Sequence, residues 1–339
     1  LDLVWWTSRF YFDRLAVLSI SIDVLSADLD TVDLARLDVG ANLNSLIFSE
    51  LTTADQGSYL VIMSNSAGEV QSSAAIVTVN ELSVLSNLSV RTTLGASQTL
   101  VVGAVVSGGS KSLLIRAGGP ALEPFGLSGL PDPEITIYNQ AADVIGQNDD
   151  WNSSLQDTFT EIGAFAFSEG SKDSAYQLDA NGPFTVHASG KEDTGTVLVE
   201  AYDLSGSSES RLTNVSARNF AGTGSDIFIA GFVISGARSH RVLIRAVGPT
   251  LGGYGISGFL EDPTLTIFNS AGEVVLQNDN WSPELASTFQ TVGAFAFPEA
   301  SNDAAIIAEL PPGAYTVQVV GVNDGVGEAL IEVYEIGDR

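Results

Sequence analysis

Short apolar runs, separated by Gly, Asn, Asp and Ser, recur along the whole chain. They predict strands at 99–109, 112–117, 134–139 and 195–204, because β-branched and aromatic runs bounded by turn residues are typical of strands. The i, i+3, i+4 spacing of an amphipathic helix is sustained nowhere, and residues 154–165 are expected to hold one short helical turn. The pattern therefore predicts an all-β protein built of sandwiches or barrels.

An internal repeat divides most of the chain. Residues 85–204 align almost without gaps with residues 212–336, which is the pattern of a tandem duplication. The matching segments include LLIRAGGPAL (113–122) and VLIRAVGPTL (242–251), QNDDW (147–151) and QNDNW (277–281), IGAFAF (162–167) and VGAFAF (292–297), and LVEAYDL (198–204) and LIEVYEI (330–336). We therefore expect two copies of one β-sandwich domain, at 82–207 and 208–339.

The first 81 residues have a different pattern. Residues 54–79 resemble the last two strands of an immunoglobulin-like domain, with Asp55 and Tyr59 where such domains place the tyrosine corner. The sequence departs from the antibody pattern at Val61, which stands where a Cys is usual, and the segment 31–37 has no Trp. We expect an immunoglobulin-like β-sandwich with an atypical first half at 1–81. The expected fold is thus three β-sandwich domains in series, the last two a tandem duplication.

The two repeats also resemble a known group of domains. The motifs LIRAxGP, NDxW, GAF and ExY, in this order, look like an uncharacterised β-repeat of large secreted bacterial proteins, which commonly follows immunoglobulin-like modules. A weaker similarity links the repeats to pre-peptidase C-terminal jelly-roll domains. The resemblance implies an extracellular or cell-surface location, and it implies no activity.

Charge and composition exclude several classes of function. The chain has 41 Asp and Glu against 14 Lys and Arg, a net charge of −27 that repels nucleic acid and anionic membranes. With 45% hydrophobic residues it is expected to fold rather than to behave as a disordered acidic tail. The chain has no Cys, which excludes disulfides and thiolate sites, and no apolar run is long enough to insert into a membrane.

The sequence predicts no enzyme. Its two histidines, His187 and His240, lie near no nucleophile motif, and its repeated carboxylates are present equally in both copies. No cofactor is expected, with the exception of calcium, whose ligands are carboxylate, amide and backbone oxygens. The alternative is that the same side chains bond to their own backbone in Asx turns. The candidate calcium ligands are Asp132, Asn148, Asp149, Asp173, Asp262, Asn278, Asp279 and Asp303.

Two arginines occupy the middle of predicted strands. Arg116 and Arg245 lie among aliphatic residues, and burying them requires a carboxylate partner. We expect acidic residues of the NDxW turn to provide it, with Trp151 and Trp281 closing the end of the sheet. The NDxW phrase is thus interpreted as a structural corner.

These observations favour an extracellular structural or adhesive protein, the repeating subunit of a surface fibre or filament that associates head to tail. The alternative is a non-catalytic accessory module that binds a carbohydrate or another surface, with Phe125 and Tyr254 among the aromatics that could stack on sugar rings. The N-terminal segment is unusually aromatic, which suggests either a strand added to a neighbouring copy or the first strand of its own domain. Its candidate assembly residues are Trp5, Trp6, Phe10, Tyr11 and Phe12.

Overall fold

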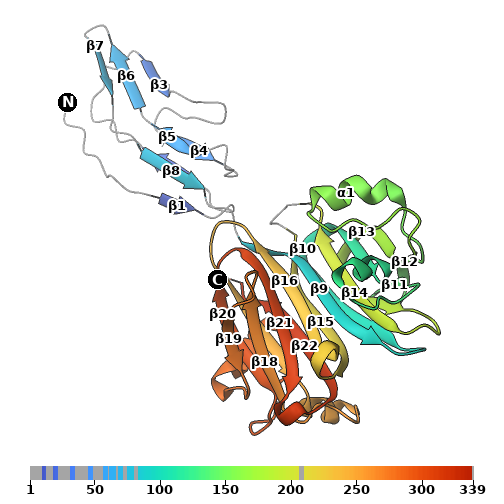
Figure 1. Cartoon of the computed structure of the whole chain (residues 1–339). Helices are drawn as coiled ribbons and strands as arrows, with labels where there is room; N and C mark the ends of the chain where they lie inside the picture. The colour runs from blue at the N-terminus through green and yellow to red at the C-terminus, as the bar shows by residue number, and fades with distance from the viewer. Residues whose placement is uncertain are drawn as a thin grey trace. The chain divides into compact units, whose positions relative to one another are not determined.

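The structure is a computed structural model that describes residues 83–205 and 210–337 and, of residues 1–82, Gln56 and eight strands (Figure 1). The chain divides into two compact units, Leu1–Leu82 with Gly236–Arg238, and Ser83–Ser235 with Ser239–Arg339. No helix among the described residues is long and apolar enough to cross a membrane.

The described residues of the first unit form short strands in three small sheets. Their order is β1-β8-β5, β2-β4 and β3-β6-β7. Strand β1 pairs in parallel with β8, and every other pair is antiparallel. The strands are β1 (Phe10–Phe12), β2 (Leu18–Ser21), β3 (Thr31–Leu34), β4 (Ser45–Phe48), β5 (Gly57–Tyr59), β6 (Val61–Asn65), β7 (Gly68–Gln71) and β8 (Ala75–Val79).

The second unit contains both repeats. In the first repeat the elements are β9 (Val84–Leu94), β10 (Thr99–Gly118), η2 (Pro120–Phe125), β11 (Glu134–Asn139), β12 (Val144–Asn148), η3 (Ser153–Leu155), α1 (Gln156–Glu161), β13 (Ser174–Ser189) and β14 (Gly195–Asp203). In the second they are β15 (Arg211–Ala221), η4 (Gly224–Asp226), β16 (Phe228–Ser235), β17 (His240–Val247), η5 (Pro249–Tyr254), β18 (Pro263–Asn269), β19 (Val274–Asn278), η6 (Pro283–Leu285), α2 (Ala286–Val292), β20 (Ala304–Leu310), β21 (Gly313–Gly321), η7 (Val322–Asp324) and β22 (Gly327–Glu335).

The two repeats share their sheets. The first strand of each repeat pairs on one side with the last strand of its own repeat, β9 with β14 and β15 with β22. On its other side it pairs with the other repeat: β9 with β16, and β15 with the first half of β10. Strands β9 and β15 also meet at Leu85 and Leu212. The hydrogen bonding is therefore reciprocal and continuous from one repeat into the other.

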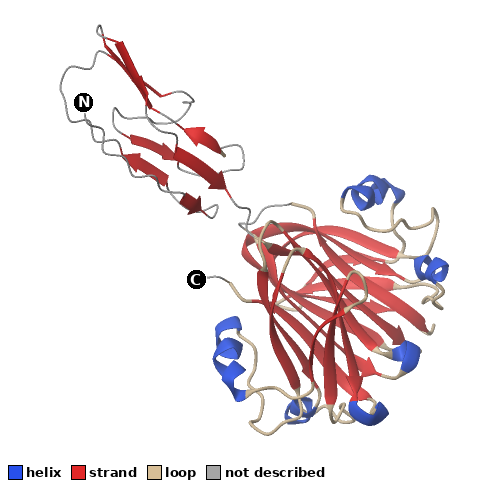
Figure 2. Cartoon of the chain, turned by 60° about the vertical axis from the view of Figure 1, so that its left-hand side comes forward, coloured by secondary structure: helices blue, strands red, loops and turns tan. Residues whose placement is uncertain are grey.

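A bend in β10 connects the two parts of this arrangement. Residues 101–107 pair with β15, and residues 113–118 pair with β14, with a register shift between Val106 and Lys111. The second repeat has two separate strands, β16 and β17, where the first repeat has the single strand β10. One buried core runs from Leu85 to Val333 and includes side chains of both repeats. Two smaller cores, one for each repeat, lie beneath the α1 and α2 segments, and Figure 2 shows these helices outside the strands.

The all-β class is confirmed. The strands predicted at 134–139 and 195–204 are β11 and β14, whereas those predicted at 99–109 and 112–117 are one continuous strand, β10. The expected helical turn is α1. The division after Leu82 lies one residue from the predicted boundary at 81. Residues 206–209, where the predicted boundary between the two repeat domains falls, lie outside the described residues. Strand pairing joins the two sides of that boundary in three places.

Candidate functional site: two buried arginine centres and an acidic corner

Arg116 lies directly opposite Glu200 on the paired strands β10 and β14. It is fully buried, and its Nη2 atom is 3.1 Å from Glu200 Oε2. Its Nη1 donates a hydrogen bond of 2.8 Å to the carbonyl oxygen of Phe165. Tyr202 donates from its hydroxyl to the other Glu200 oxygen at 2.7 Å. The charge is thus paired with a carboxylate inside the protein, as a buried arginine requires. Arg116 is hydrogen-bonded through Nη1, whereas its Nε and Nη2 atoms and Glu200 Oε2 have no hydrogen-bond partner.

Aromatic rings enclose the guanidinium group. The centroids of Phe159, Phe165 and Phe167 lie 4.5, 4.5 and 4.1 Å from Arg116 Cζ. Trp151 stacks on Phe159 with centroids 5.4 Å apart, which extends the cluster to the NDxW turn. Cation–π attraction is strongest where water is excluded, so these rings stabilise the arginine as well as cover it.

The second repeat builds the same centre. Arg245 lies opposite Glu332, with Nε and Nη2 at 2.8 and 2.6 Å from Oε2. Its Nη1 donates to the carbonyl oxygen of Phe295 at 2.5 Å, and Tyr334 donates to Glu332 at 2.6 Å. The rings around Arg245 Cζ are Phe289, Phe295 and Phe297, at 4.7, 4.2 and 4.2 Å.

Burial determines the protonation of these centres. Burial raises the pKa of Tyr202 above its ordinary value, and the charge of Glu200 raises it further. The pKa of Tyr334 is raised for the same two reasons, with Glu332 as the neighbouring charge. Both phenols, which are protonated at neutral pH even at the ordinary tyrosine pKa of about 10, keep their protons to higher pH and act as hydrogen-bond donors to the carboxylates.

The loop after each arginine strand is anchored by a buried aspartate. Asp173 Oδ1 accepts hydrogen bonds from the backbone N–H groups of Gly119 and Ala121, at 2.7 and 3.1 Å. A Cβ atom at Gly119 would lie 2.1 Å from the carbonyl oxygen of Leu130, so no side chain fits there. Pro120 then begins the 3-10 helix η2. In the second repeat, Asp303 anchors Gly248 and Thr250 in the same way.

These contacts explain the repeated sequence motifs. LIRAxGP provides the arginine, the closely packed glycine and the proline that starts η2 or η5. NDxW provides the stacked tryptophan, GAF provides a ring and an acceptor carbonyl, and ExY provides the carboxylate and its tyrosine donor. Motifs distributed over almost ninety residues of each repeat (Arg116 to Tyr202) thus converge on one arginine.

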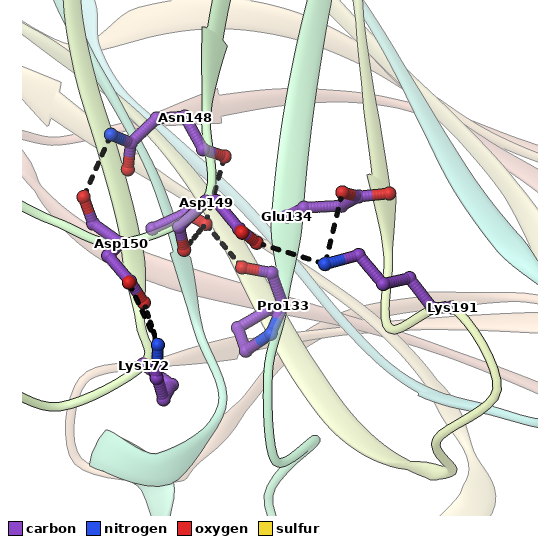
Figure 3. Close-up of polar contacts among 8 residues, drawn as sticks. Pro133, Glu134, Asn148, Asp149, Asp150, Lys172 and Lys191 are labelled. Carbon is purple, nitrogen blue, oxygen red and sulfur yellow. Dashed lines mark hydrogen bonds and ion pairs between the residues drawn. The ribbon is translucent and has the colours of Figure 1, made fainter.

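The NDxW turn of the first repeat forms an exposed polar corner beside this centre (Figure 3). Asn148 accepts the backbone N–H of Ala175 at 2.8 Å and donates to the carbonyl oxygen of Asp150 at 2.9 Å. Lys191 Nζ is 3.4 Å from Asp149 and 3.6 Å from Glu134, and Lys172 Nζ is 2.8 Å from Asp150. Two lysines therefore partly neutralise a group of carboxylates at this corner.

The second repeat keeps the turn and lacks the lysines. Asn278 accepts the backbone N–H of Ala305 at 3.0 Å, as Asn148 does for Ala175. Val322 and Asn302 stand at the positions of Lys191 and Lys172. Burial, and to a smaller extent the nearby charge of Asp279, raise the pKa of Asp262. Thr264 and Asn280 stand at the positions of Glu134 and Asp150, so the second corner lacks two carboxylates together with the two lysines. The two corners have one backbone design and different charged residues.

The expected partners of the arginines were wrong. Glu200 and Glu332, on the last strand of each repeat, provide the carboxylates, whereas Asp149 and Asp150 of the NDxW turn contact lysines. The repeated ExY motif was the signal that could have identified them, because a glutamate that keeps its place in both last strands can pair across a sheet. Trp151 is 8% exposed and covers the aromatic cluster, and Trp281 stacks on Phe289 in the same place.

The candidate calcium ligands fall into two groups. Protein donors occupy oxygens of Asn148, Asp149, Asp173, Asn278, Asp279 and Asp303. These donors lie 15 to 55 positions away in the sequence, so the bonds are tertiary contacts rather than the local Asx turns that the alternative expected. In Asp132 and Asp262, one carboxylate oxygen is buried and without a hydrogen-bond donor. Within the described residues, no three His, Cys, Asp or Glu side chains are grouped as a metal site.

The remaining candidates lie in the first unit. Tyr59 ends β5, and Asp55 lies outside the described residues. Phe10, Tyr11 and Phe12 form β1, which pairs with β8 of the same chain, as the alternative of a first strand in its own domain expects. Trp5 and Trp6 lie outside the described residues.

The comparisons with known proteins add no family. No protein-family model matches the chain, and no curated protein sequence matches it significantly.

Proposed function

We propose that this chain is an extracellular structural or adhesive protein, the repeating subunit of a surface fibre or filament. The observation that carries the proposal is the sharing of sheets between the two repeats. Strands β9 and β15 each hydrogen-bond to both repeats, so the repeats cannot separate without breaking two full strand pairs. Such a junction would resist a force applied along the subunit. The force would act on many hydrogen bonds at once rather than on a single linker peptide.

The buried arginine centres support the same proposal. Arg116 and Arg245 are 0% exposed, and their polar partners are protein groups, so they fit a role in fixing the loops outside the sheets. The proposal assigns them no substrate and the chain no catalytic step. The acidic surface, with a net charge of −27, fits an exposed and highly solvated protein at the cell surface.

The test is the state of association of the purified whole chain. Sedimentation velocity over a wide concentration range and electron microscopy of negatively stained samples should show linear polymers with one regular repeat. A single species of 35.4 kDa at every concentration would contradict the proposal.

A carbohydrate-binding accessory module is the second candidate, and two exposed rings favour it. Phe125 and Tyr254 are 65% and 62% exposed at the same position of the two repeats. Each packs edge-on against a ring of the arginine centre, Phe165 or Phe295. Aromatic platforms of this kind stack on the apolar faces of sugars. A monomeric chain that is retained on an immobilised polysaccharide, and that loses retention in the variant Phe125→Ala with Tyr254→Ala, would establish this function instead.

A further inference from the structure

The junction between the two repeats consists of two equivalent strand pairs, β9 with β16 and β15 with the first half of β10 (Figure 1). Arg91 lies opposite Ile229 in the first pair, and the equivalent residues Arg218 and Val101 lie opposite each other in the second. Each pair has one register shift, at the equivalent position of the two repeats. The two repeats therefore contribute the same surface to the junction.

The match between the two strand pairs includes side chains. Gly103 lies opposite Ser216, whose Oγ atom would be 2.7 Å from a Cβ atom at that glycine. The equivalent Gly231 lies opposite Ser89, whose Oγ atom would be 2.5 Å from a Cβ atom there. In both strand pairs, a glycine of one repeat thus makes room for a serine of the other.

A repeat with this surface is complementary to a second repeat of the same kind. Leu85 and Leu212 occupy the same position of the two repeats and lie directly opposite each other, so a local twofold axis passes between them. The main core contains side chains of both repeats, so a repeat that lost its partner would expose apolar side chains and unpaired strands. The surface that covers them is the same surface of another repeat, in the same chain or in another copy.

Lys111 holds the connection between the repeats, which runs from Asp203 at the end of β14 to Arg211 at the start of β15. Its Nζ atom, at the bend of β10, is 2.8 Å from Asp203 Oδ2. It also donates to Ser205 Oγ at 3.1 Å and to the carbonyl oxygen of Ser210 at 2.5 Å. Lys111 is 1% exposed, so one buried ammonium group binds both ends of the connection.

The connection is short. Four residues separate Ser205 from Ser210, and they span at most about 17 Å (five steps of about 3.4 Å). A second repeat that moved to another copy would therefore pull the connection away from Lys111. Short connections of this kind favour the exchange of domains between copies, whereas the contacts of Lys111 oppose it.

We propose that the junction also forms between copies of this chain, with the second repeat of one copy paired to the first repeat of the next, and that Lys111 favours pairing within one chain. The proposal rests on the proposed function and identifies the contact that a filament requires. Exchange of an identical element is a low-cost route to association, because the same contacts form again. Each exchanged pair leaves one first repeat and one second repeat for further copies, so the assembly can grow.

Two serines at the junction allow a direct test. Ser86 on β9 and Ser235 on β16 have their Oγ atoms 2.6 Å apart, and the chain has no cysteine of its own. The full chain with Ser86→Cys and Ser235→Cys is unfolded, refolded at several concentrations and oxidised. Pairing within a chain gives linked monomers in non-reducing electrophoresis, and exchange gives linked multimers. Because a short connection gives an effective concentration on the order of millimolar, the multimer fraction should rise about tenfold for each tenfold rise in protein concentration below that value.

The single variant Ser86→Cys is the control, because it has no second cysteine at the junction. A multimer fraction in the double variant no larger than in this control, at every concentration, would overturn the proposal. If wild-type chain polymerises while the double variant gives only linked monomers, the exchange fails and the proposed function stands. If wild-type chain stays monomeric while the refolded double variant gives linked multimers, the exchange stands and the proposed function fails.

A lysine variant tests the part assigned to Lys111. Lys111→Met, added to the double-cysteine chain, should raise the multimer fraction at a given concentration by about tenfold, the equivalent of one hydrogen bond to a charged group. Lys172→Met is the matched control, because Lys172 contacts Asp150 at the exposed corner and should leave the fraction unchanged. Equal multimer fractions in the two variants would show that Lys111 does not favour pairing within one chain.

Discussion

Arg245 and Glu332 lie directly opposite each other on β17 and β22, and two guanidinium nitrogens, Nε and Nη2, contact the same carboxylate oxygen at 2.8 and 2.6 Å. Arg116 and Glu200 repeat the pairing in the first repeat. Each pair is enclosed by aromatic rings and by a segment that contains α1 or α2. The stability of each outer core therefore depends on one carboxylate.

Replacing that carboxylate should be costly. The variant Glu332→Gln leaves Arg245 as a buried charge without a counter-ion, and we expect a loss of about 3–5 kcal/mol in the free energy of unfolding. Urea denaturation followed by tryptophan fluorescence measures it. The exposed neighbour Glu309, on β20, is the control, and Glu309→Gln should change the free energy by less than about 0.5 kcal/mol. Similar small losses for both variants would show that the pair does not hold the outer core.

The two tyrosines of the arginine centres, Tyr202 and Tyr334, should ionise only at a pH well above that of an ordinary tyrosine. Their folded-state pKa values lie above that of the unfolded chain, so the folded state holds these protons longer. The resulting stability is fully present below about pH 10, the ordinary pKa of tyrosine, and is lost as pH rises toward the folded pKa. Absorbance of tyrosinate during alkaline titration should show Tyr202 and Tyr334 ionising only as the protein unfolds.

A double variant identifies these groups among the eight tyrosines of the chain. Tyr202→Phe with Tyr334→Phe should remove two groups from the late fraction and none from the fraction that titrates near pH 10. Loss of two groups from the early fraction would mean that the phenols are accessible in the folded protein.

The loop anchors make a third prediction. In Asp303→Ala, the backbone N–H groups of Gly248 and Thr250 lose their acceptor, with an expected cost of roughly 1–3 kcal/mol for each donor left buried and unpaired. Asp303→Asn, which retains one acceptor oxygen, should lose less. Chemical denaturation measures both variants, and a loss in the alanine variant no larger than in the asparagine variant would contradict the anchoring role.

The sequence predicted the strands and the repeat well, because both depend on local pattern. Alternation and turn residues located β10, β11 and β14, and the duplicated motifs located the arginine centres. The carboxylate partner of each arginine could not be predicted from local sequence pattern. Glu200 is 84 positions from Arg116 (200 − 116), and only the register of β10 and β14 brings them together. The bend in β10 and the pairing of β9 with β16 likewise depend on long-range contacts that neither repeat specifies alone.

Hydrogen exchange of the whole chain tests the sharing of sheets between the repeats most directly. In Glu332→Gln, the destabilising change lies only in the second repeat. Because β9 and β15 belong to both halves, the account predicts that slowly exchanging amides of β10 and β14 in the first repeat accelerate together with those of β17 and β22, by about 100-fold or more for a loss of 3 kcal/mol. Acceleration confined to the second repeat, with β10 and β14 protected as in the wild type, would show two independent domains and contradict the account.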